Sequence, residues 1–340
     1  MAIRTAILGY GRSGSSLHAD PIEALPEFDL VAVCDIAAPA RAKAEARFHC
    51  RTYEDYKVML ASETLDLVVI VTRSHQHCEM TCDCLAAGVN VLVTKPWALD
   101  AAEALRMIAA SKESGKLLLP WLPSRWGGDL IRLQELVASG IIGKVFQIRR
   151  SEFNLGTRAD WQTQRRFGGG YLLNWGPHLV DPPLLLAGSP ARSVFGELKQ
   201  IMNPGDVEDV VFAVLQTENG ITVVSEYNIG AREFPNWVVQ GDKGTIIVRE
   251  TEIEIFRALP VDPPDPQAFG TSPVVVATKD DSGRVTQANR YGDAMEIYPC
   301  IAQAVRGESP YPIPTESALG LTRVLDAIRK SSATRSIVEL

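Results

Sequence analysis

The 340-residue sequence has no apolar run long enough to cross a membrane. Its longest apolar stretches are "LDLVVIVT" at 65–72 and "PPLLLAG" at 182–188, far shorter than the ~20 residues that a membrane span requires. The N-terminus, "MAIRTAILGYG", lacks the cationic segment, apolar core and cleavage site of a secretion signal. These absences predict a soluble cytoplasmic protein that has no membrane partner.

The sequence also lacks an excess of positive charge. Lys and Arg number 34 against 41 Asp and Glu, so the formal net charge is −7. A molecule of this charge repels the phosphates of nucleic acids and anionic lipid headgroups. We therefore expect no nucleic-acid partner.

Cysteine is sparse, and its irregular spacing in a long chain without an export signal favours reduced thiols over disulfides. One cluster, "HQHCEMTCDC" at 75–84, could hold a metal ion, because Cys78 and Cys82 would share a helix face. The alternative is a crossover helix with small residues facing a sheet. Since the CxxC pairs typical of closed zinc sites are missing, we predict no metal.

Length favours two domains, and 46% hydrophobic residues provide enough apolar surface for both cores. The first 120 residues alternate short apolar runs (3–9, 30–35, 65–72, 90–95, 116–120) with helical patterns (15–25, 39–48, 77–87, 100–114). Strands that are apolar on both faces, each followed by a helix, indicate a parallel sheet covered on both sides. We predict an α/β fold that begins with a doubly wound Rossmann domain over residues 1–122.

The alternation of strand and helix patterns ends after residue 122. A helix at about 127–139 precedes strand patterns at 144–153, 209–217, 221–229, 236–241, 245–249 and 253–257. Turn signals such as "ENG" and "GDKG" separate several of them by hairpin spacing. We predict an α+β domain over 123–340 with a largely antiparallel open sheet, a proline-rich surface loop or lid at 259–273, and a closing helix at 315–333.

Three glycines in "ILGYGRSGSS" stand between the first strand and the first helix. Gly9 allows a tight turn, Gly11 leaves room for a pyrophosphate, and Gly14 lets helix and strand pack closely. Asp35 ends the next strand, where an acid binds the ribose hydroxyls of a dinucleotide. An acid there disfavours the 2′-phosphate of NADP, and Arg41, the nearest cation, is interpreted as a solvated helix residue. We therefore expect NAD rather than NADP as the cofactor.

Two further positions favour chemistry but have plainer explanations. Lys95 ends the fourth clear strand, in "VTKPW", at the sheet edge where such folds bind ligands; a strand-end lysine can also simply point to water. In "GGGYLLNWGPHLVD" at 168–181, Asn174, His178 and Asp181 would share one helix face. Pro177 indicates a kink there, and Asp181 can instead cap a helix that begins at Pro182.

Taken in order, these segments resemble the glucose-fructose oxidoreductase, inositol dehydrogenase and rhizopine catabolism family (Gfo/Idh/MocA). The resemblance covers "GYGRSGSSLHADPIEAL" with "LVAVCD", "VTRSHQHCEMTCDCLAAGVNVLVTKP", "ASGIIGKVFQIRR", "GGGYLLNWGPHLVD" and "GESPYPIPTESALGLTRVLDAIRKS". It implies that Lys95 contacts the nicotinamide side and the substrate hydroxyl. It also implies that His178 is the acid or base toward the alcohol, and that Asn174 stands where many members have an aspartate paired with that histidine.

The resemblance extends the predicted cofactor site beyond the glycines and Asp35. Thr72 and His77 match a segment that lines the nicotinamide half, and Trp161 matches a tryptophan that borders cofactor or substrate. The predicted cofactor-binding residues are Gly9, Gly11, Arg12, Ser13, Gly14, Asp35, Ile36, Thr72, Arg73, His77, Thr94, Lys95 and Trp161.

Four residues depart from the family pattern. Thr94 replaces a usual Glu, Arg73 a common Pro, and Pro123 a frequent Asn. Asn174 carries no charge, so His178 has no anionic partner there and its imidazolium is less stabilised. We interpret Asn174 as fixing the ring of His178 or bonding a neighbouring hydroxyl, His75 as a helix cap, and His18 and His49 as structural.

The sequence thus predicts hydride transfer between NAD and a secondary alcohol of a sugar, sugar acid or cyclitol. In this hypothesis His178 takes the alcohol proton while Lys95 and Asn174 assist. Two alternatives stay open: NAD-assisted cleavage of a glycoside through a transient keto-sugar, and a non-catalytic dinucleotide sensor. Because the open antiparallel sheet needs a cover, we also expect a homodimer or homotetramer.

Overall fold

The computed structural model describes residues 1–259 and 274–340. Most of the proline-rich segment that the sequence predicts as a surface loop or lid, residues 260–273, therefore lies outside the described residues. The chain divides into two compact units. The first comprises 1–123, 164–177 and 293–326, and the second comprises 124–163, 178–292 and 327–340.

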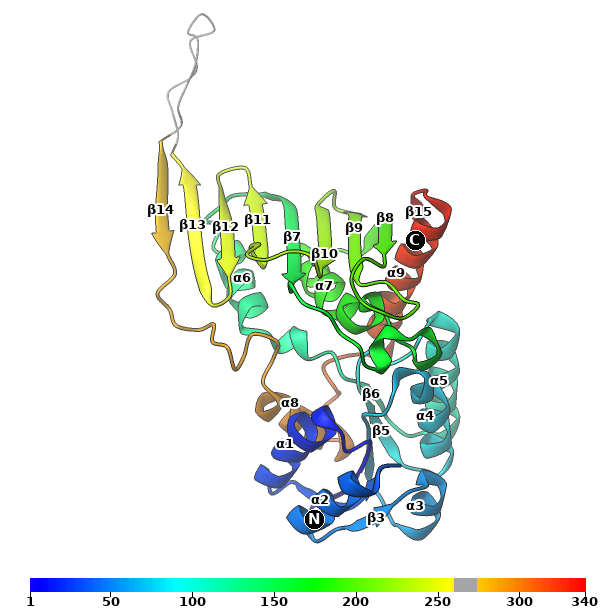
Figure 1. Ribbon diagram of the computed structural model, residues 1–340. Helices are drawn as coiled ribbons and strands as arrows, with labels where there is room; N and C mark the ends of the chain where they lie inside the picture. Colours follow the sequence, from blue (N-terminus) through cyan, green and yellow to red (C-terminus); the bar gives the residue numbers. More distant parts are fainter. Residues whose placement is uncertain (260–273) are drawn as a thin grey trace, which may run out of the picture. The chain divides into compact units, whose positions relative to one another are not determined.

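The first unit is built on a parallel sheet with strand order β3-β2-β1-β4-β5-β6 (Figure 1). This order confirms the predicted doubly wound fold, because the chain starts in the middle of the sheet and winds outward in both directions. The strands are β1 (Ile3–Leu8), β2 (Phe28–Cys34), β3 (Arg51–Tyr53), β4 (Leu67–Ile70), β5 (Asn90–Val93) and β6 (Leu118–Pro120).

The first unit contains short helices, most of which follow these strands as the alternation of patterns predicts. In chain order they are the π-helix η1 (Gly14–His18), α1 (Ala19–Ala24), α2 (Ala38–Phe48), α3 (Tyr56–Ser62), η2 (Ser74–Gln76), α4 (His77–Ala86), α5 (Ala101–Ser114), η5 (Arg165–Phe167) and α8 (Ala294–Val305). Every residue of β4 is inaccessible to solvent, which explains its unbroken apolar run. The sequence reading missed β3, a short and partly polar strand, the short helix α3, and α8, which contains Pro299.

The second unit is built on a nine-stranded sheet in the order β14-β13-β12-β11-β7-β10-β9-β8-β15. Only β7 and β10 pair in parallel; the other neighbours are antiparallel, as predicted. The strands are β7 (Val145–Phe153), β8 (Ala191–Lys199), β9 (Val210–Thr217), β10 (Thr222–Asn228), β11 (Trp237–Gly241), β12 (Gly244–Arg249), β13 (Glu252–Ala258), β14 (Val275–Lys279) and β15 (Val338–Glu339).

Helices pack on one face of this sheet. They are α6 (Gly128–Ala138), α7 (Tyr171–Ala187) and α9 (Thr315–Thr334), with the short η3 (Pro123–Trp126) and η4 (Trp161–Thr163) beside them in sequence. Strand residues that point to this face, such as Trp237 and Leu215, are buried, while alternating residues such as Phe212 and Val214 are only partly covered. The strands therefore show the two-residue period of a sheet with one covered face.

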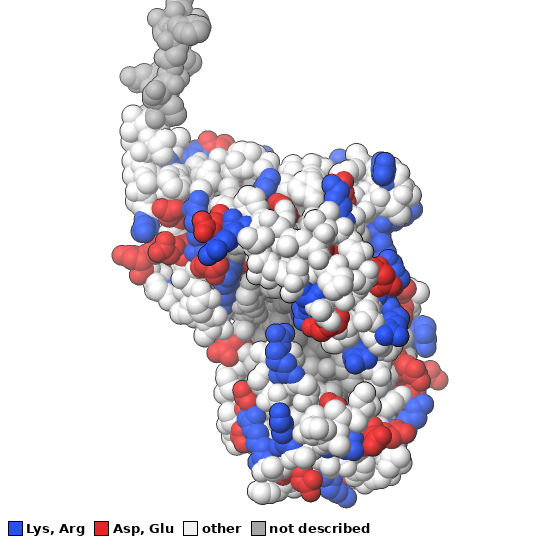
Figure 2. Space-filling view, in the orientation of Figure 1, with Lys and Arg blue, Asp and Glu red and all other residues white. Residues whose placement is uncertain are grey.

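The surface carries charges of both signs, interspersed over the face shown in Figure 2. Among the helices that the structure describes, none combines the length and the apolar character needed to cross a membrane.

Candidate active site

The turn after β1 has three glycines for three different steric reasons. Gly9 has a φ of +92°, and a Cβ there would lie 2.8 Å from the carbonyl oxygen of Val71. A Cβ on Gly14 would overlap the carbonyl oxygen of Gly9. At Gly11, by contrast, no atom lies within 4 Å of the Cβ position. Gly9 and Gly14 are therefore required by the turn itself, and Gly11 leaves open space of the kind that a dinucleotide pyrophosphate needs.

Asp35 fixes the end of β2 to this turn. One carboxylate oxygen accepts a hydrogen bond from the amide of Tyr10 and the other from the amide of Ala37, both at 2.8 Å. Gly9 also donates its amide to the carbonyl of Cys34. Because each carboxylate oxygen has a second lone pair, Asp35 can still accept bonds from ribose hydroxyls. The glycine turn and Asp35 thus fit the ribose and pyrophosphate of a dinucleotide.

The interpretation of Arg41 as a solvated residue was wrong. Its guanidinium donates to the carbonyls of Asp35 (2.8 Å) and Ile36 (3.1 Å) and pairs with Glu54 at 3.2 Å. The side chain is only 20% exposed. Arg41 therefore caps the carbonyls that follow β2, immediately behind Asp35.

The other predicted cofactor residues of the first unit lie at the carboxyl ends of the parallel strands. Arg12 and Ser13 directly precede η1, and Ile36, after β2, is 76% exposed. Thr94 donates its hydroxyl and its amide to the carbonyl of Ile70.

Arg73 stacks its guanidinium 4.3 Å from the centroid of the Phe167 ring. Trp161 lies in η4 of the second unit.

His77 joins two of these strand ends. Its Nδ1 lies 2.8 Å from the carbonyl oxygen of Pro96 and its Nε2 lies 3.0 Å from that of Thr72. Burial lowers the pKa of the ring, and the two carbonyls oppose that effect. His77 therefore fixes the Thr72 loop to the Lys95–Pro96 segment.

The His and Cys residues at 75–84, which the sequence analysis weighed as a metal site, take part in helix packing and ring contacts. His75 does not cap α4: the N-cap is Gln76, without a side-chain cap bond, and the His75 ring instead lies 5.5 Å from the Phe167 ring. Cys78 and Cys82 stand one turn apart on α4, and burial raises the pKa of both thiols. No group of three His, Cys, Asp or Glu suited to a metal ion occurs within 1–259 and 274–340. All six cysteines are free thiols.

Lys95 reaches helix α7. Its Nζ donates to both the backbone carbonyl and the side-chain oxygen of Asn174, each at 2.8 Å. The Lys95–Pro96 peptide bond is cis. Two residues on, the indole of Trp97 donates to the hydroxyl of Thr322 at 2.8 Å, which holds the segment in place. The structure thus brings together Lys95 and Asn174, two of the three predicted catalytic residues, within the first unit.

Helix α7 runs without a break from Tyr171 to Ala187, so the predicted start of a helix at Pro182 was wrong. Proline has no amide hydrogen, so Pro183 leaves the carbonyl of Leu179 without its helical partner. The hydroxyl of Ser225, from β10, donates to that carbonyl at 2.8 Å. A tertiary hydrogen bond therefore replaces the helical one that Pro183 removes.

Asp181 consequently lies inside α7 and does not cap a helix. Its two carboxylate oxygens accept from Nε and Nη2 of Arg125, both at 2.8 Å, in a bidentate ion pair. The side chains of Arg125 and Asp181 are 12% and 8% exposed. Burial raises the pKa of the Asp181 carboxyl, and the bonds to Arg125 oppose that effect.

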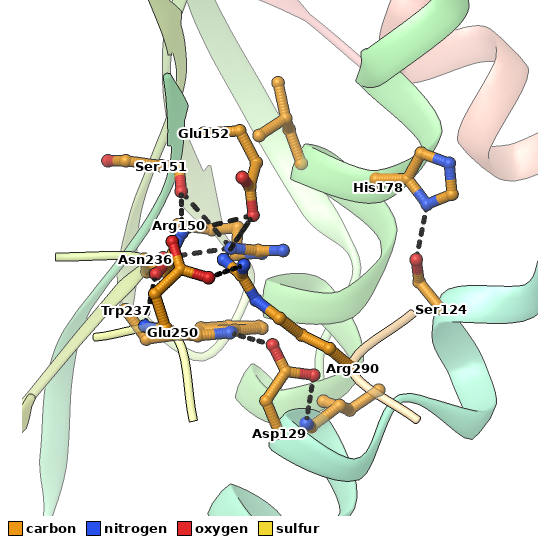
Figure 3. Close-up of polar contacts among 12 residues, drawn as sticks. Ser124, Asp129, Arg150, Ser151, Glu152, His178, Asn236, Trp237, Glu250 and Arg290 are labelled. Atoms are coloured by element: carbon orange, nitrogen blue, oxygen red, sulfur yellow. Dashed lines mark hydrogen bonds and ion pairs between the residues drawn. The ribbon is translucent and has the colours of Figure 1, made fainter. Parts of the chain in front are cut away.

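His178 lies one turn after Asn174 on α7 and is buried. Its Nδ1 forms a hydrogen bond with the hydroxyl of Ser124 from η3, as Figure 3 shows. The prediction that Asn174 fixes this ring is replaced by a different contact, since the Asn174 side-chain oxygen accepts from Lys95. The ring of Tyr291 stands edge-on to His178 at 5.7 Å.

A buried polar network lies beside this histidine in Figure 3. Arg150 pairs with Glu152 at 2.7 Å, Glu152 also pairs with Arg290 at 3.1 Å, and Arg290 pairs with the more exposed Glu250. The indole of Trp237 donates to Asp129 at 2.7 Å. These pairings satisfy charges that would otherwise be costly to bury.

The sequence reading missed Ser124 and Arg125. Both follow β6, the last parallel strand, in "LPSRW". Polar residues directly after the carboxyl end of a parallel strand are the signal that could have identified them.

Two family models match the chain. Residues 3–120 match GFO_IDH_MocA, the oxidoreductase family with an NAD-binding Rossmann fold, and residues 130–247 match the GFO/IDH/MocA C-terminal domain.

Relatives of similar length match the chain over almost its whole length. The chain is 25% identical to the uncharacterized oxidoreductase YdgJ of Escherichia coli (strain K12), over 95% of this chain and 94% of that protein. It is 23% identical to scyllo-inositol 2-dehydrogenase (NADP(+)) IolW of Bacillus subtilis (strain 168), over 99% and 96%.

A solved structure shares the whole fold. The NAD-binding protein from Listeria innocua superimposes with a TM-score of 0.85 at 26% identity, covering 100% of this chain and 97% of that one. With both family models matched in order, the chain belongs to the Gfo/Idh/MocA oxidoreductase family and contains its NAD-binding Rossmann domain.

Proposed function

We propose that the protein transfers a hydride between NAD and a secondary alcohol of a sugar, sugar acid or cyclitol. The observation that carries this proposal is the pair of hydrogen bonds that Lys95 Nζ donates to the backbone carbonyl and the side-chain oxygen of Asn174. It joins the strand-end lysine of the dinucleotide-binding sheet to the helix that carries His178 one turn later. Family membership and the inositol dehydrogenase among its relatives support the substrate class.

The cofactor would be held by the glycine turn and by Asp35, where the open space at Gly11 and the fixed carboxylate fit a dinucleotide. When bound, the nicotinamide accepts or returns the hydride. We propose NAD over NADP, because the Asp35 carboxylate repels a 2′-phosphate. Arg41 does not offset this repulsion, since its guanidinium is occupied by the carbonyls of Asp35 and Ile36 and by Glu54.

In this proposal three side chains have separate roles in the reaction. His178 takes the proton of the alcohol during oxidation and returns it during reduction. Lys95, as a cation, orients the substrate hydroxyl and stabilises the negative charge that develops on its oxygen. The side-chain oxygen of Asn174 accepts from the ammonium of Lys95 and so keeps the cation in one direction.

A substrate screen tests the proposal. Purified protein is mixed with NAD or NADP and a panel of polyols, aldoses, sugar acids and keto-glycosides, and NADH or NADPH fluorescence is followed. We expect turnover with NAD and at least one polyhydroxylated alcohol. A clear NADP preference would remove Asp35 from its role. Release of an aglycone without net NADH would replace the dehydrogenase by a redox-assisted glycoside hydrolase or lyase, and dinucleotide binding without any turnover would indicate a sensor.

Two properties of the whole molecule belong to the same proposal. The partly covered apolar residues on the second sheet, Phe212 and Val214 among them, favour burial against a second copy of the chain, in a homodimer or homotetramer. The free thiols agree with a reducing compartment, and we propose the cytoplasm. Light scattering in solution tests the first property.

A further inference from the structure

The imidazole of His178 has two nitrogens, and only one of them can face a substrate. Nδ1 is engaged with the hydroxyl of Ser124. Both residues are nearly inaccessible, at 8% and 7% exposure, so water does not compete easily for this bond. For Nε2 to accept a proton, Nδ1 must carry the ring hydrogen and donate it. The hydroxyl oxygen of Ser124 can accept that hydrogen in both the neutral and the charged state of the ring.

Ser124 is itself held against α7 by its neighbours. Arg125, the next residue, makes the bidentate pair with Asp181, which follows His178 by three positions on the same helix face. The carbonyl of Ser124 accepts from the amide of Gly127 at 3.1 Å. Segment η3 and helix α7 are therefore joined at two points one turn apart, one neutral and one ionic.

We propose that Ser124 is the positioning residue of His178, fixing the tautomer with hydrogen on Nδ1 so that Nε2 exchanges the proton with the substrate, and that the Arg125–Asp181 pair holds Ser124 in place. This inference rests on the proposed acid–base role of His178. It gives the site a neutral hydroxyl at the ring nitrogen where the sequence reading expected Asn174 to act.

The charged groups that η3, α7 and the segment of Tyr291 bring near the ring are paired with one another. On η3 and α7, Arg125 and Asp181 neutralise one another. Tyr291, which packs edge-on, has its pKa raised by burial and stays uncharged. Beyond it, Glu152 is shared by Arg150 and Arg290. The imidazolium of His178 thus gains less stabilisation than an aspartate at Ser124 would provide.

The test compares Ser124→Ala, Ser124→Thr and Ser124→Asp with the wild type. We expect Ser124→Ala to lower kcat about 10- to 100-fold, the range for residues that orient a reacting group, with KM little changed. Ser124→Thr keeps the hydroxyl and should restore activity. Ser124→Asp should move the acid limb of the kcat/KM profile to higher pH by about one unit or more.

A matched control separates positioning from stability. Ser225→Ala removes another buried serine bond to α7, the one to the Leu179 carbonyl, without touching the ring of His178. It should lower thermal stability as much as Ser124→Ala does while leaving the pH profile of kcat/KM unchanged. An unchanged kcat in Ser124→Ala, or an unmoved acid limb in Ser124→Asp, would overturn the inference.

A readout independent of turnover keeps the two proposals apart. The chain has five histidines, so ¹⁵N spectra of the imidazoles are simple, and His178→Asn identifies the signal of His178. We expect the Nδ1–H tautomer in the wild type and a mixture in Ser124→Ala. If His178→Asn retains turnover, the catalytic role of His178 fails, yet the spectra still decide about Ser124. An unchanged tautomer in Ser124→Ala would contradict the inference whatever the activity.

Discussion

The turn after β1 and the polar face of α7 both lie beside glycines, but they are fixed by different kinds of contact. In the turn, Gly14 packs on Gly9, and Asp35 bonds Tyr10 only 25 residues away. On α7, Asn174 bonds a lysine 79 residues away, and His178 and Asp181 bond partners 54 and 56 residues away. Closely packed backbone atoms, Val71 against Gly9 among them, determine the turn, whereas polar side chains from distant segments form the polar face of α7.

This difference separates two kinds of sensitivity. The glycine turn is destabilised when an atom is added, because the surrounding backbone atoms cannot move aside. The polar face of α7 is destabilised when one partner of a bond is removed, because the other partner stays buried without compensation. The variants below probe each region with the change to which it should be most sensitive.

The largest effect is expected at the lysine that reaches α7. Lys95→Met removes the cation but keeps a side chain of similar length, so turnover should fall by about 10³-fold or more. NAD binding should persist, since the glycine turn and Asp35 are untouched. Steady-state kinetics together with NAD titration measure both quantities, with the exposed Lys43→Met as control. Retained turnover would remove Lys95 from the mechanism.

The ion pair behind Ser124 should give the next largest effect. Asp181→Asn leaves the Arg125 guanidinium buried without its charge partner, which should lower the free energy of unfolding by about 3–5 kcal/mol. The double change Arg125→Met with Asp181→Leu removes both charges and should recover most of that loss. Urea unfolding of these two variants and of the single changes Arg125→Met and Asp181→Leu checks this. Additive losses would show that the two side chains do not act as a pair.

Two alanine substitutions in the glycine turn should separate its steric and binding functions. Gly14→Ala places a Cβ against the Gly9 carbonyl oxygen and should cost roughly 1–3 kcal/mol of stability. Gly11→Ala meets no atom within 4 Å, so stability should change by less than about 0.5 kcal/mol. NAD affinity of Gly11→Ala should nevertheless fall about tenfold or more, on the order of 1.4 kcal/mol. Normal NAD affinity would place the pyrophosphate elsewhere.

The smallest effect concerns pH. Burial lowers the pKa of His18 from its ordinary 6.5 to about 3, and its Nδ1 lies 2.9 Å from the hydroxyl of Tyr298. Because the unfolded chain binds a proton that the folded one does not, stability should fall as pH drops from about 6.5 toward 3. The slope from this group is at most about 1.4 kcal/mol per pH unit.

His18→Gln should remove that contribution, so its unfolding free energy should decline less steeply with acidification than that of the wild type. Urea unfolding at half-unit pH steps between 7 and 4 measures the difference in slope. Parallel curves for the two proteins would show that His18 is protonated in the folded state as readily as in the unfolded one.

The elements that sequence patterns predicted well are those with a strong apolar period. Strands β1, β4 and β9 follow their predicted ranges because burial on one or both faces determines which residues can stand there. Strand β8, with its glycine and alternating charges, and helix α8, with its internal proline, lack such a period and were missed.

Helix α7 shows the limit of local rules. Its prolines predict a new helix start at Pro182, whereas α7 is continuous there, and Ser225 supplies a hydrogen bond to the carbonyl that Pro183 frees. The glycine turn shows the opposite case. Its roles follow from φ and Cβ geometry alone, and the structure gives Gly9, Gly11 and Gly14 the surroundings that the motif predicts.

By itself the sequence determined the parallel sheet, the glycine turn with Asp35, and the presence of a lysine at the end of β5. These depend on apolar periods and on the backbone conformation of the turn, which the residue pattern itself specifies. Only the tertiary structure decided that Lys95 bonds Asn174, that Ser124 bonds His178, and that Arg125 pairs with Asp181. A polar side chain takes whichever partner the fold brings within about 3 Å, and no local pattern in the chain specifies that partner.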